Sequence, residues 1–254
     1  MLNYVEYGKE NKYDDDIFFQ KYSQMSRSQQ GLAGAGEWET LRKLLPDFKD
    51  KRVLDLGCGY GWHCIYAMEH GASSVVGVDI SHKMLEVAKE KTHFPQVEYK
   101  CCAIEDVEFP EESFDVILSS LAFHYVADYE ILVKKIYRIL KSGGKLVFTV
   151  EHPVFTAYGT QDWYYNEKGE ILHFPVDNYY YEGKRTAVFL GEKVTKFHRT
   201  LTTYLNTLLS NGFIINHIVE PQPPEYMMDI PGMQDEMRRP MMLIVSANKK
   251  VDSL

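Results

Sequence analysis

Residues 53–62 read VLDLGCGYGW, an apolar run that ends in an acid and is followed by three glycines at alternate positions. Glycines in such a run cost conformational entropy on folding, so they are kept where the backbone needs a positive φ or must lie against another group. The turn after the first strand of an open α/β sheet is a ligand-binding crevice. This stretch therefore predicts a ligand against the backbone of residues 57–61.

Apolar runs alternate with amphipathic helical patterns along most of the chain. The runs are nearly continuous, as in strands that are buried on both faces of a parallel sheet. We therefore predict an α/β fold with a doubly wound, mostly parallel sheet, in a single domain over residues 1–254. The predicted strands are RVLDL (52–56), SVVGVD (74–79), VEYKCCA (97–103), FDVILSSLAF (114–123), KLVFTV (145–150), FIINHIV (213–219) and MMLIVSA (241–247).

A helix is predicted before the first strand, over residues 38–45, and further helices between the strands, over residues 62–71, 81–91, 128–140 and 200–212. Ser81 and Asp128 are of the residue types that cap helix N-termini. The buried face of the 128–140 helix is predicted to carry Ile131, Leu132, Ile136, Ile139 and Leu140. Gly143 and Gly144 are predicted to turn the chain into the strand that follows.

Two segments depart from this alternation. Residues 1–36 are polar and aromatic, and residues 151–199 carry eleven aromatic residues between Phe155 and Phe197, about twice the density of the whole chain. The second segment follows the end of a central strand, where open α/β sheets bind ligands. We interpret it as an insertion that forms a lid or substrate wall; a surface flap that buries its own aromatic side chains is the alternative.

Composition restricts the partners. The net charge of −8 argues against a nucleic-acid or anionic-membrane surface, and no apolar run approaches the roughly 18 residues that a membrane span needs. The four cysteines form no CxxC pair, and Cys58, His63 and Cys64 have no second ligand pair, so no metal site is predicted. We expect a soluble cytoplasmic protein that acts on a small molecule; its oligomeric state is left open.

The glycine spacing argues against a dinucleotide. The fingerprint G-x-G-x-x-G would need glycine at position 62, which is Trp62, and the last glycine comes one residue early. Asp55 beside the loop is a poor neighbour for pyrophosphate and suits an ammonium group. Asp79, at the end of the second strand, can accept both hydroxyls of a ribose. A ribose and a cationic amino-acid part without phosphate indicate S-adenosylmethionine.

Four segments resemble the class I S-adenosylmethionine-dependent methyltransferases, in the broad type 11 group that includes C-methyltransferases of ubiquinone and menaquinone biosynthesis. They are VLDLGCGYGWHCIYAMEHGA, VVGVDISHKMLEVAKEK, IEDVEFPEESFDVILSSLAFHYV and YRILKSGGKLVFTV, and they cover roughly residues 50–152. The resemblance implies a Rossmann-like sheet of seven strands whose last strand is antiparallel. It also implies methyl transfer to a small-molecule acceptor, with S-adenosylhomocysteine as the product.

The resemblance also implies cofactor contacts. Ala103 stands where many relatives have an Asp that meets the adenine amino group, which leaves adenine to the Ile104 backbone and to Glu105. The first helices of such enzymes close over the cofactor, and FFQKYSQMSRSQQG resembles them. The implied residues are the loop glycines Gly57, Gly59 and Gly61; Asp55 for the amine; Asp79 for the ribose; Ile80, Met84, Ile104 and Glu105 for adenine; Ser119 and Leu121 for the methionine part; and Tyr22 and Arg27 in the closing segment.

Arg27 is predicted to meet the methionine carboxylate, with an exposed basic side chain as the alternative. If the acceptor carries a proton, a base must remove it, and histidine suits that role. His152 is the first candidate and His198 the second, whereas His124 is interpreted as structural; for each, a non-catalytic role stays open. A cofactor-binding protein without turnover and, less favoured, an NAD-dependent oxidoreductase are the alternative functions.

Overall fold

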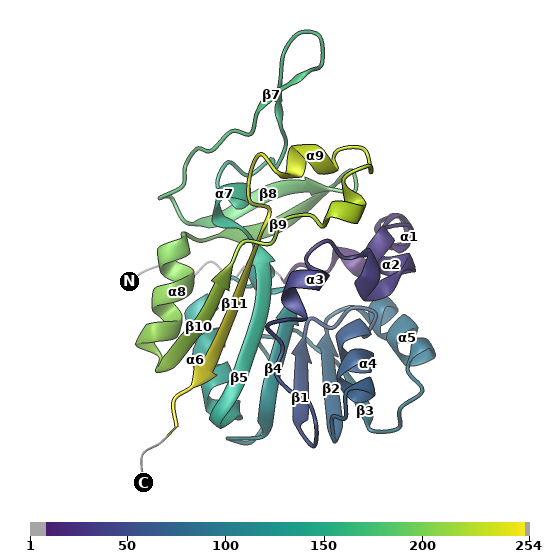
Figure 1. Ribbon diagram of the computed structural model, residues 1–254, viewed down its shortest axis with the longest axis vertical. Coiled ribbons are helices and arrows are strands. Elements are labelled where there is room, and N and C mark those ends of the chain that lie inside the picture. The colour runs from purple at the N-terminus through teal and green to yellow at the C-terminus, as the bar shows by residue number, and fades with distance from the viewer. Residues whose placement is uncertain (1–8, 252–254) are drawn as a thin grey trace.

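The computed structural model describes residues 9–251 and is built around a seven-stranded sheet. Its strand order is β10-β11-β5-β4-β1-β2-β3. The bounds are β1 Arg52–Leu56, β2 Ser74–Asp79, β3 Val97–Cys101, β4 Phe114–Ser120, β5 Leu140–Glu151, β10 Phe213–Val219 and β11 Met242–Lys249. All seven predicted strands are present, and Figure 1 shows them side by side in one twisted sheet.

The pairing of the strands confirms the predicted topology. β1 lies between β2 and β4 and is parallel to both, and the parallel pairs β2–β3 and β4–β5 extend the sheet on either side. β11 is antiparallel to β5 and to β10, as expected for the last strand. The chain thus moves outward from β1 in both directions, which makes the carboxyl ends of β1 and β4 the point where such sheets bind ligands.

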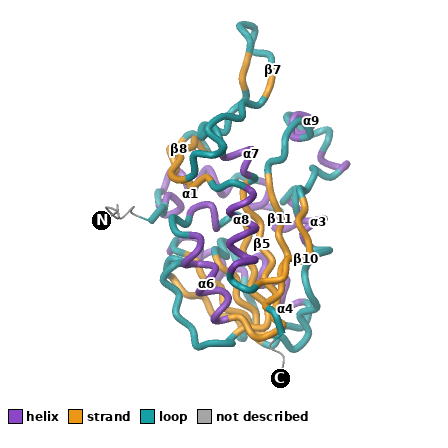
Figure 2. Tube along the Cα trace, turned by 90° about the vertical axis from the view of Figure 1, so that its left-hand side faces the viewer, coloured by secondary structure: helices purple, strands orange, loops and turns teal. Residues whose placement is uncertain are grey.

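Helices cover both faces of the sheet, and several short helices lie near its carboxyl edge. The α-helices are α1 Asp16–Ser23, α2 Ser26–Gln29, α3 Trp38–Leu41, α4 Trp62–Glu69, α5 His82–Lys91, α6 Tyr129–Ile139, α7 Pro153–Thr156, α8 Leu201–Ser210 and α9 Met233–Glu236; the 3₁₀ helices are η1 Lys12–Asp14, η2 Gly31–Gly34, η3 Phe123–Tyr125 and η4 Glu225–Met227. Figure 2 shows α6 and α8 in front of the strands in that view.

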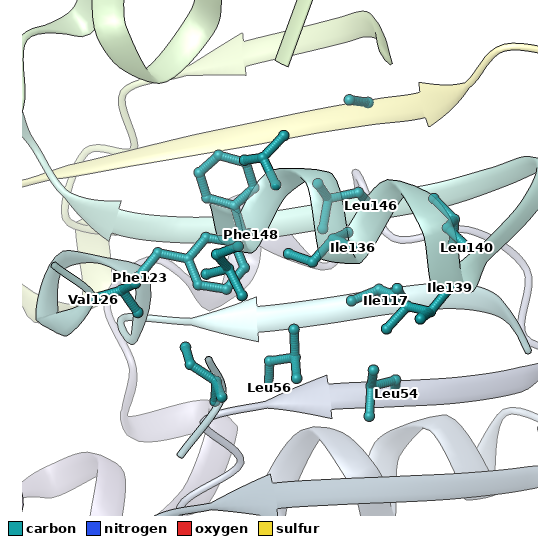
Figure 3. Close-up of a cluster of buried hydrophobic side chains, with 14 of the residues drawn as sticks. Leu54, Leu56, Ile117, Phe123, Val126, Ile136, Ile139, Leu140, Leu146 and Phe148 are labelled. Atoms are coloured by element: carbon teal, nitrogen blue, oxygen red, sulfur yellow. The ribbon is translucent and has the colours of Figure 1, made fainter. Parts of the chain in front are cut away.

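Alternate residues of each central strand enter different cores. Leu54 and Leu56 of β1 pack with the buried side of α6, whereas Val53 faces the core that contains Trp38 and Leu41 of α3. Figure 3 shows the first of these cores, in which Ile117 and Phe148 of the neighbouring strands meet the helix. Burial on both faces explains why the strands are almost continuously apolar in sequence.

The helix ends largely follow the sequence signals. The Ser81 side chain accepts a hydrogen bond from the Met84 amide and Asp128 accepts one from Ile131, so both predicted caps are confirmed. Ile131 itself is 52% exposed, because it lies one position off the buried stripe of α6. Gly143 does not precede β5 as predicted but lies within it at φ +72°, where the pairing with β4 shifts register.

The segment between β5 and α8 forms two hairpins. The first pairs β6 (Tyr164–Tyr165) with β7 (Ile171–His173) and extends away from the body of the protein in Figures 1 and 2. The second pairs β8 (Gly183–Phe189) with β9 (Glu192–His198) above the carboxyl edge of the sheet. Aromatic rings of the insertion pack on one another, as the Phe155–Phe174 stack at 5.7 Å shows.

We predict that Gly61→Ala destabilises the protein more than Gly59→Ala in the absence of any ligand. A Cβ on Gly61 would lie 2.2 Å from the Tyr99 hydroxyl, whereas one on Gly59 would meet no atom within 4 Å. Both positions have positive φ, so Gly59→Ala reports backbone strain of about 1–2 kcal/mol and Gly61→Ala adds about 1–3 kcal/mol of overpacking. Urea unfolding measures the difference; equal losses would contradict this packing role.

Candidate functional site

A cavity of about 640 Å³ opens at the carboxyl edge of the parallel strands. Four parts of the chain line it: the segments at the ends of β1 to β5; the N-terminal residues 9–37; the β8–β9 hairpin; and residues 221–242. The last segment reaches this edge because β11 is antiparallel, so that its first residue, Met242, pairs with Glu151 at the end of β5. The volume is typical of a small-molecule site.

The glycine loop forms one side of the cavity, but its three glycines have different roles. A Cβ on Gly57 would lie 2.4 Å from Cβ of Ala122, and one on Gly61 would strike Tyr99, so packing within the protein requires both. Gly61 is not among the lining residues. Only Gly59 faces open space, at φ +52°. Space for a ligand is therefore the reason for glycine at position 59, whereas packing within the protein is the reason for glycine at positions 57 and 61.

The Asp79 carboxylate lies on the cavity wall and organises the loop. Its Oδ2 accepts the Gly59 amide at 2.8 Å and its Oδ1 accepts the Ser81 amide at 2.9 Å. Burial raises the pKa of Asp79 above its usual range, although these two hydrogen bonds counteract the shift. Each carboxylate oxygen has a further lone pair, so the group can hold the loop and still accept from two hydroxyls.

Asp55 lies behind the loop rather than on the cavity surface. Its side chain is 1% exposed, and Oδ2 is 3.5 Å from the Cys64 thiol, which donates to it. Oδ1 has no hydrogen-bond partner among the described residues. Burial raises the pKa of Asp55 to about 7. A buried carboxylate oxygen without a partner is costly, and a cationic ligand group would remove that cost.

At the end of β4 the lining residue is one position later than predicted. Ser119 is buried and donates its hydroxyl to the Leu56 carbonyl at 2.7 Å, whereas Ser120 lines the cavity. Leu121 also lines it, with an unusual positive φ of 54°. Its amide donates to the Thr149 side chain at 3.0 Å, which helps to hold this strained residue in place.

An apolar strip adjoins Asp79 on the β2–β3 side. Ile80, Met84 and Ile104 line the cavity there, as predicted for residues beside a flat ring. Glu105 and Ala103 line it as well. Met84 and Ile104 are largely buried, so only a small part of each side chain is exposed to the cavity and both are held in place by their neighbours.

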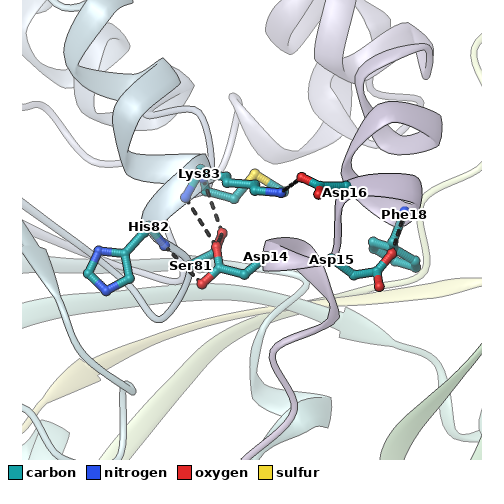
Figure 4. A network of polar contacts seen from close by, with 8 residues as sticks. Asp14, Asp15, Asp16, Phe18, Ser81, His82 and Lys83 are labelled. Atoms are coloured by element: carbon teal, nitrogen blue, oxygen red, sulfur yellow. Dashed lines mark hydrogen bonds and ion pairs between the residues drawn. The ribbon is translucent and has the colours of Figure 1, made fainter.

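The N-terminal segment covers the cavity and is fixed to α5. Tyr22 and Arg27 both line it, and the Arg27 guanidinium bonds both oxygens of Glu37 at 2.6 and 2.9 Å. Arg27 is therefore paired and half-buried, not an exposed basic side chain. Figure 4 shows how Asp14 anchors the segment: its carboxylate accepts the Ser81 hydroxyl at 2.6 Å and the Lys83 amide at 3.1 Å.

The two histidines predicted as bases do not reach the cavity. His152 caps α7 through Nδ1, which accepts the Val154 amide, and its Nε2 lies 2.9 Å from Glu220. His198 is fully buried, with Nδ1 2.7 Å from the Thr156 hydroxyl and Nε2 2.9 Å from the Tyr179 carbonyl. Nε2 of His152 is buried near Glu220 without forming a hydrogen bond, and both ring nitrogens of His198 have protein partners, so neither histidine lines the cavity although each lies near a strand end in sequence.

The histidine that does line the cavity is His124, which the sequence suggested to be structural. Only 1% of its surface is exposed to solvent, and its Nδ1 accepts a hydrogen bond from the Glu151 amide at 3.4 Å. Burial lowers the pKa of His124 to about 4, so the ring is neutral at physiological pH.

Sequence reasoning missed the far half of the cavity. Residues 221–242 appeared only as a proline-rich stretch, but they contribute a largely apolar wall: Pro221, Pro223, Tyr226, Met227, Ile230, Met233, Met241 and Met242. Tyr13, Tyr125, Glu151 and Lys196 line the cavity as well. Methionine and proline are concentrated between two predicted strands, and this composition could have indicated an apolar surface. No periodic pattern, however, indicated that the segment lies at the cavity.

Neither a cluster of metal-ligand side chains nor a membrane-spanning helix is found among the described residues. No group of three or more His, Cys, Asp or Glu side chains within residues 9–251 is arranged to hold a metal ion. Among the helices in that range, none is long and apolar enough to cross a bilayer.

Comparison with known proteins identifies the cofactor. A family model described as a methyltransferase domain matches residues 54–148. A crystal structure from Listeria monocytogenes, assigned to the S-adenosylmethionine-dependent methyltransferases, is 58% identical, with a TM-score of 0.83, over 87% of this chain and 99% of that one. A crystal structure from Mesorhizobium loti, also of an S-adenosylmethionine-dependent methyltransferase, is 41% identical, with a TM-score of 0.79. The match covers 86% of this chain and 100% of that one.

An uncharacterized protein of Haemophilus influenzae is 34% identical over 93% of this chain and 96% of its own. The open space at Gly59, the unpartnered Asp55 oxygen and the carboxylate of Asp79 fit the backbone-proximal, cationic and ribose parts of S-adenosylmethionine. The protein belongs to the class I S-adenosylmethionine-dependent methyltransferases and uses S-adenosylmethionine as its cofactor.

Proposed function

We propose that this methyltransferase acts on a small-molecule acceptor that has an apolar body. The observation that carries the proposal is that one cavity is lined both by the glycine loop with Asp79 and by the largely apolar residues 221–242. Methionine side chains adapt to irregular apolar shapes, so the wall suits a hydrophobic ligand better than a polar polymer. The net charge of −8 also disfavours nucleic acid as the acceptor.

In this proposal the cofactor half uses residues that the sequence singled out. Asp79 accepts the ribose hydroxyls, and the Asp55 carboxylate compensates the methionine amine from behind the loop. Ile80, Met84, Ile104 and Glu105 surround adenine, while Leu121 lies beside the methionine portion. Tyr22 and Arg27 cover the cofactor, with Arg27 exchanging part of its pairing with Glu37 for the methionine carboxylate. Gly57, Gly61 and Ser119 act through packing.

The bound cofactor supplies a methyl group on a sulfonium, so its departure leaves a neutral thioether. The protein's contribution is then mainly to align the acceptor atom with that methyl group and to exclude water. The cover formed by residues 9–37 and the apolar wall serve both purposes. Among the described histidines, His124 is the one that lines the cavity; its Nδ1 accepts the Glu151 amide, so the neutral ring carries its proton on Nε2 and can donate a hydrogen bond to a ligand rather than act as a base.

Turnover tests the acceptor assignment. We expect release of S-adenosylhomocysteine with members of a panel of phenols, quinol precursors, amines and carboxylic acids that share an apolar body, and none above background with equally functionalised compounds that lack one. The physical reason is the apolar area that the wall can cover. Highest turnover with a polar acceptor, or none with any small molecule, would overturn the proposal.

Asp79→Asn should raise the Kd for S-adenosylhomocysteine by at least about tenfold, because the amide loses one of the acceptors needed by the ribose hydroxyls. Asparagine keeps an oxygen for the Gly59 amide, so the loop can persist. Calorimetric titration measures the affinity. The control is Asp128→Asn at the N-cap of α6, which should bind normally; an unchanged Kd in Asp79→Asn would remove Asp79 from the site.

Asp55→Asn should stabilise the protein without cofactor at pH 8 and weaken cofactor binding there. Burial raises the folded-state pKa of Asp55 to about 7, so its contribution to stability is fully present below the unfolded pKa of about 4 and is lost as pH rises to about 7. The variant lacks this titration. Its advantage in unfolding free energy should therefore shrink as pH falls from 8 toward 4.

Asp115→Asn is the matched control for this pH dependence. Asp115 accepts the Arg52 amide and pairs with Lys141, and although its partial burial raises its pKa, these contacts lower it overall. Its stabilisation is present at neutral pH and is lost as pH falls through the lowered pKa, so Asp115→Asn should destabilise at pH 7. The same sign of effect in both variants would contradict the assignment of Asp55.

A further inference from the structure

A buried lysine lies on the wall of the acceptor half. Lys196 of β9 is 3% exposed, and its Nζ donates to Glu151 Oε1 at 2.6 Å and to Gln161 Oε1 at 2.8 Å. The Gln161 amide in turn donates to the other Glu151 oxygen at 2.6 Å. These bonds account for two of the three N–H groups of the ammonium. Burying an ammonium costs several kcal/mol unless it is well paired, so its position at a cavity calls for an explanation.

Tyrosine hydroxyls adjoin this ammonium. Lys196 Nζ lies 5.9 Å from the centre of the Tyr125 ring, and the Tyr125 hydroxyl is 3.4 Å from that of Tyr13. Burial raises the pKa of both tyrosines, so both stay protonated in the physiological range and can donate hydrogen bonds. Lys196, Tyr125 and Tyr13 all line the cavity. The acceptor half thus has several donors grouped on one wall.

The acids around Lys196 are held by protein donors. Glu151 uses one oxygen for Lys196 and the other for Gln161, and the Glu10 carboxylate accepts the Thr195 amide at 2.6 Å. His124 is neutral, so it adds no charge. Lys196 and Glu151 form a neutral pair, so the choice of acceptor depends on the hydrogen-bonding groups that remain available. A cationic group would have to compete with Lys196 and Gln161 for the Glu151 oxygens, whereas an anionic oxygen can accept from the third N–H of the ammonium and from the one tyrosine hydroxyl that does not donate to the other.

Resting on the proposed function, we propose that Lys196 is the specificity-determining residue of the acceptor half and that its ammonium binds an oxyanion, phenolate or carboxylate, carried by an apolar body. Glu151 and Gln161 are positioning residues that hold the ammonium at the wall. Lys196 and Gln161 belong to the segment between β5 and α8, outside the region 54–148 that the methyltransferase family model matches, whereas Tyr125 lies within it.

4-Nitrophenol, whose phenolate has its own absorption band, is the probe. The full chain saturated with S-adenosylhomocysteine is titrated with pH in the presence of the probe, so that no sulfonium contributes to the result. We expect the apparent pKa of bound 4-nitrophenol to fall by about one unit, which corresponds to a tenfold preference for the phenolate. Lys196→Met should abolish this shift, and Lys196→Arg should retain most of it.

Lys193→Met is the matched control, because Lys193 is exposed on the same strand and does not line the cavity. It should leave the shift unchanged. Glu151→Gln supplies an independent variant if Lys196→Met fails to fold: without the neighbouring carboxylate the ammonium should attract the phenolate more, and the shift should increase. Unchanged affinity for S-adenosylhomocysteine shows that a variant is folded.

Competition by related compounds identifies the source of the oxyanion. Displacement of the probe by 4-nitrobenzoate at lower concentrations than 4-nitrophenol itself requires assigns a carboxylate; the reverse order assigns a phenolate. Equal or better displacement by 4-nitrobenzylamine overturns the proposal. So does a shift that survives in Lys196→Met, or absence of probe binding to a wild-type protein that binds S-adenosylhomocysteine. Failure to bind S-adenosylhomocysteine would contradict the proposed function instead.

Discussion

The Asp79 carboxylate is the contact on which the arrangement of the site depends. It connects the end of β2 to the Gly59 amide in the loop after β1 and to the Ser81 amide at the start of α5. The same corner receives the N-terminal segment, because Asp14 accepts the Ser81 hydroxyl. One carboxylate therefore determines the shape of the loop, and through Ser81 it influences where the cover over the cavity docks.

Paired charges join the segments that surround the cavity. Arg27 with Glu37 lies within the N-terminal cover, and Lys196 with Glu151 connects the β8–β9 hairpin to the end of β5. Arg239 bonds Glu236 at 2.7 Å and lies over the Phe155 and Phe174 rings, so residues 221–242 are tied to the insertion. Buried pairs of this kind contribute modestly to stability, because desolvation offsets their attraction, but they fix the mutual position of their segments.

The sequence predicted the sheet, the order of its elements and many of the residues that line the cavity near Asp79. These features depend on local signals: continuous apolar strands, caps at Ser81 and Asp128, and acids at strand ends. What failed depends on long-range packing. Tyr99, on another strand, determines the requirement for glycine at position 61, and the alternation of β4 decides that Ser120 rather than Ser119 faces the cavity.

The acceptor half was harder to predict for the same reason. His152 and His198 lie at or next to the ends of strands. Residues far away in sequence contact them, because Glu220 lies beside the His152 ring and Thr156 bonds to the His198 ring. The apolar wall of residues 221–242 has no helical or strand period, and only the direction of β11 brings it to the site. No local pattern in a single sequence indicates that two segments so far apart along the chain lie at the same cavity.

The cavity's two halves come from different stretches of the chain, and this separation bears on evolution. The crevice around Asp79 belongs to the shared methyltransferase domain, whereas the β8–β9 hairpin and residues 221–242 contribute other parts of the cavity lining. Mutations can accumulate in those peripheral pieces without disturbing the strand register or the crevice. Substitutions in those segments can therefore change which acceptor the enzyme binds, while the methyl donor stays the same.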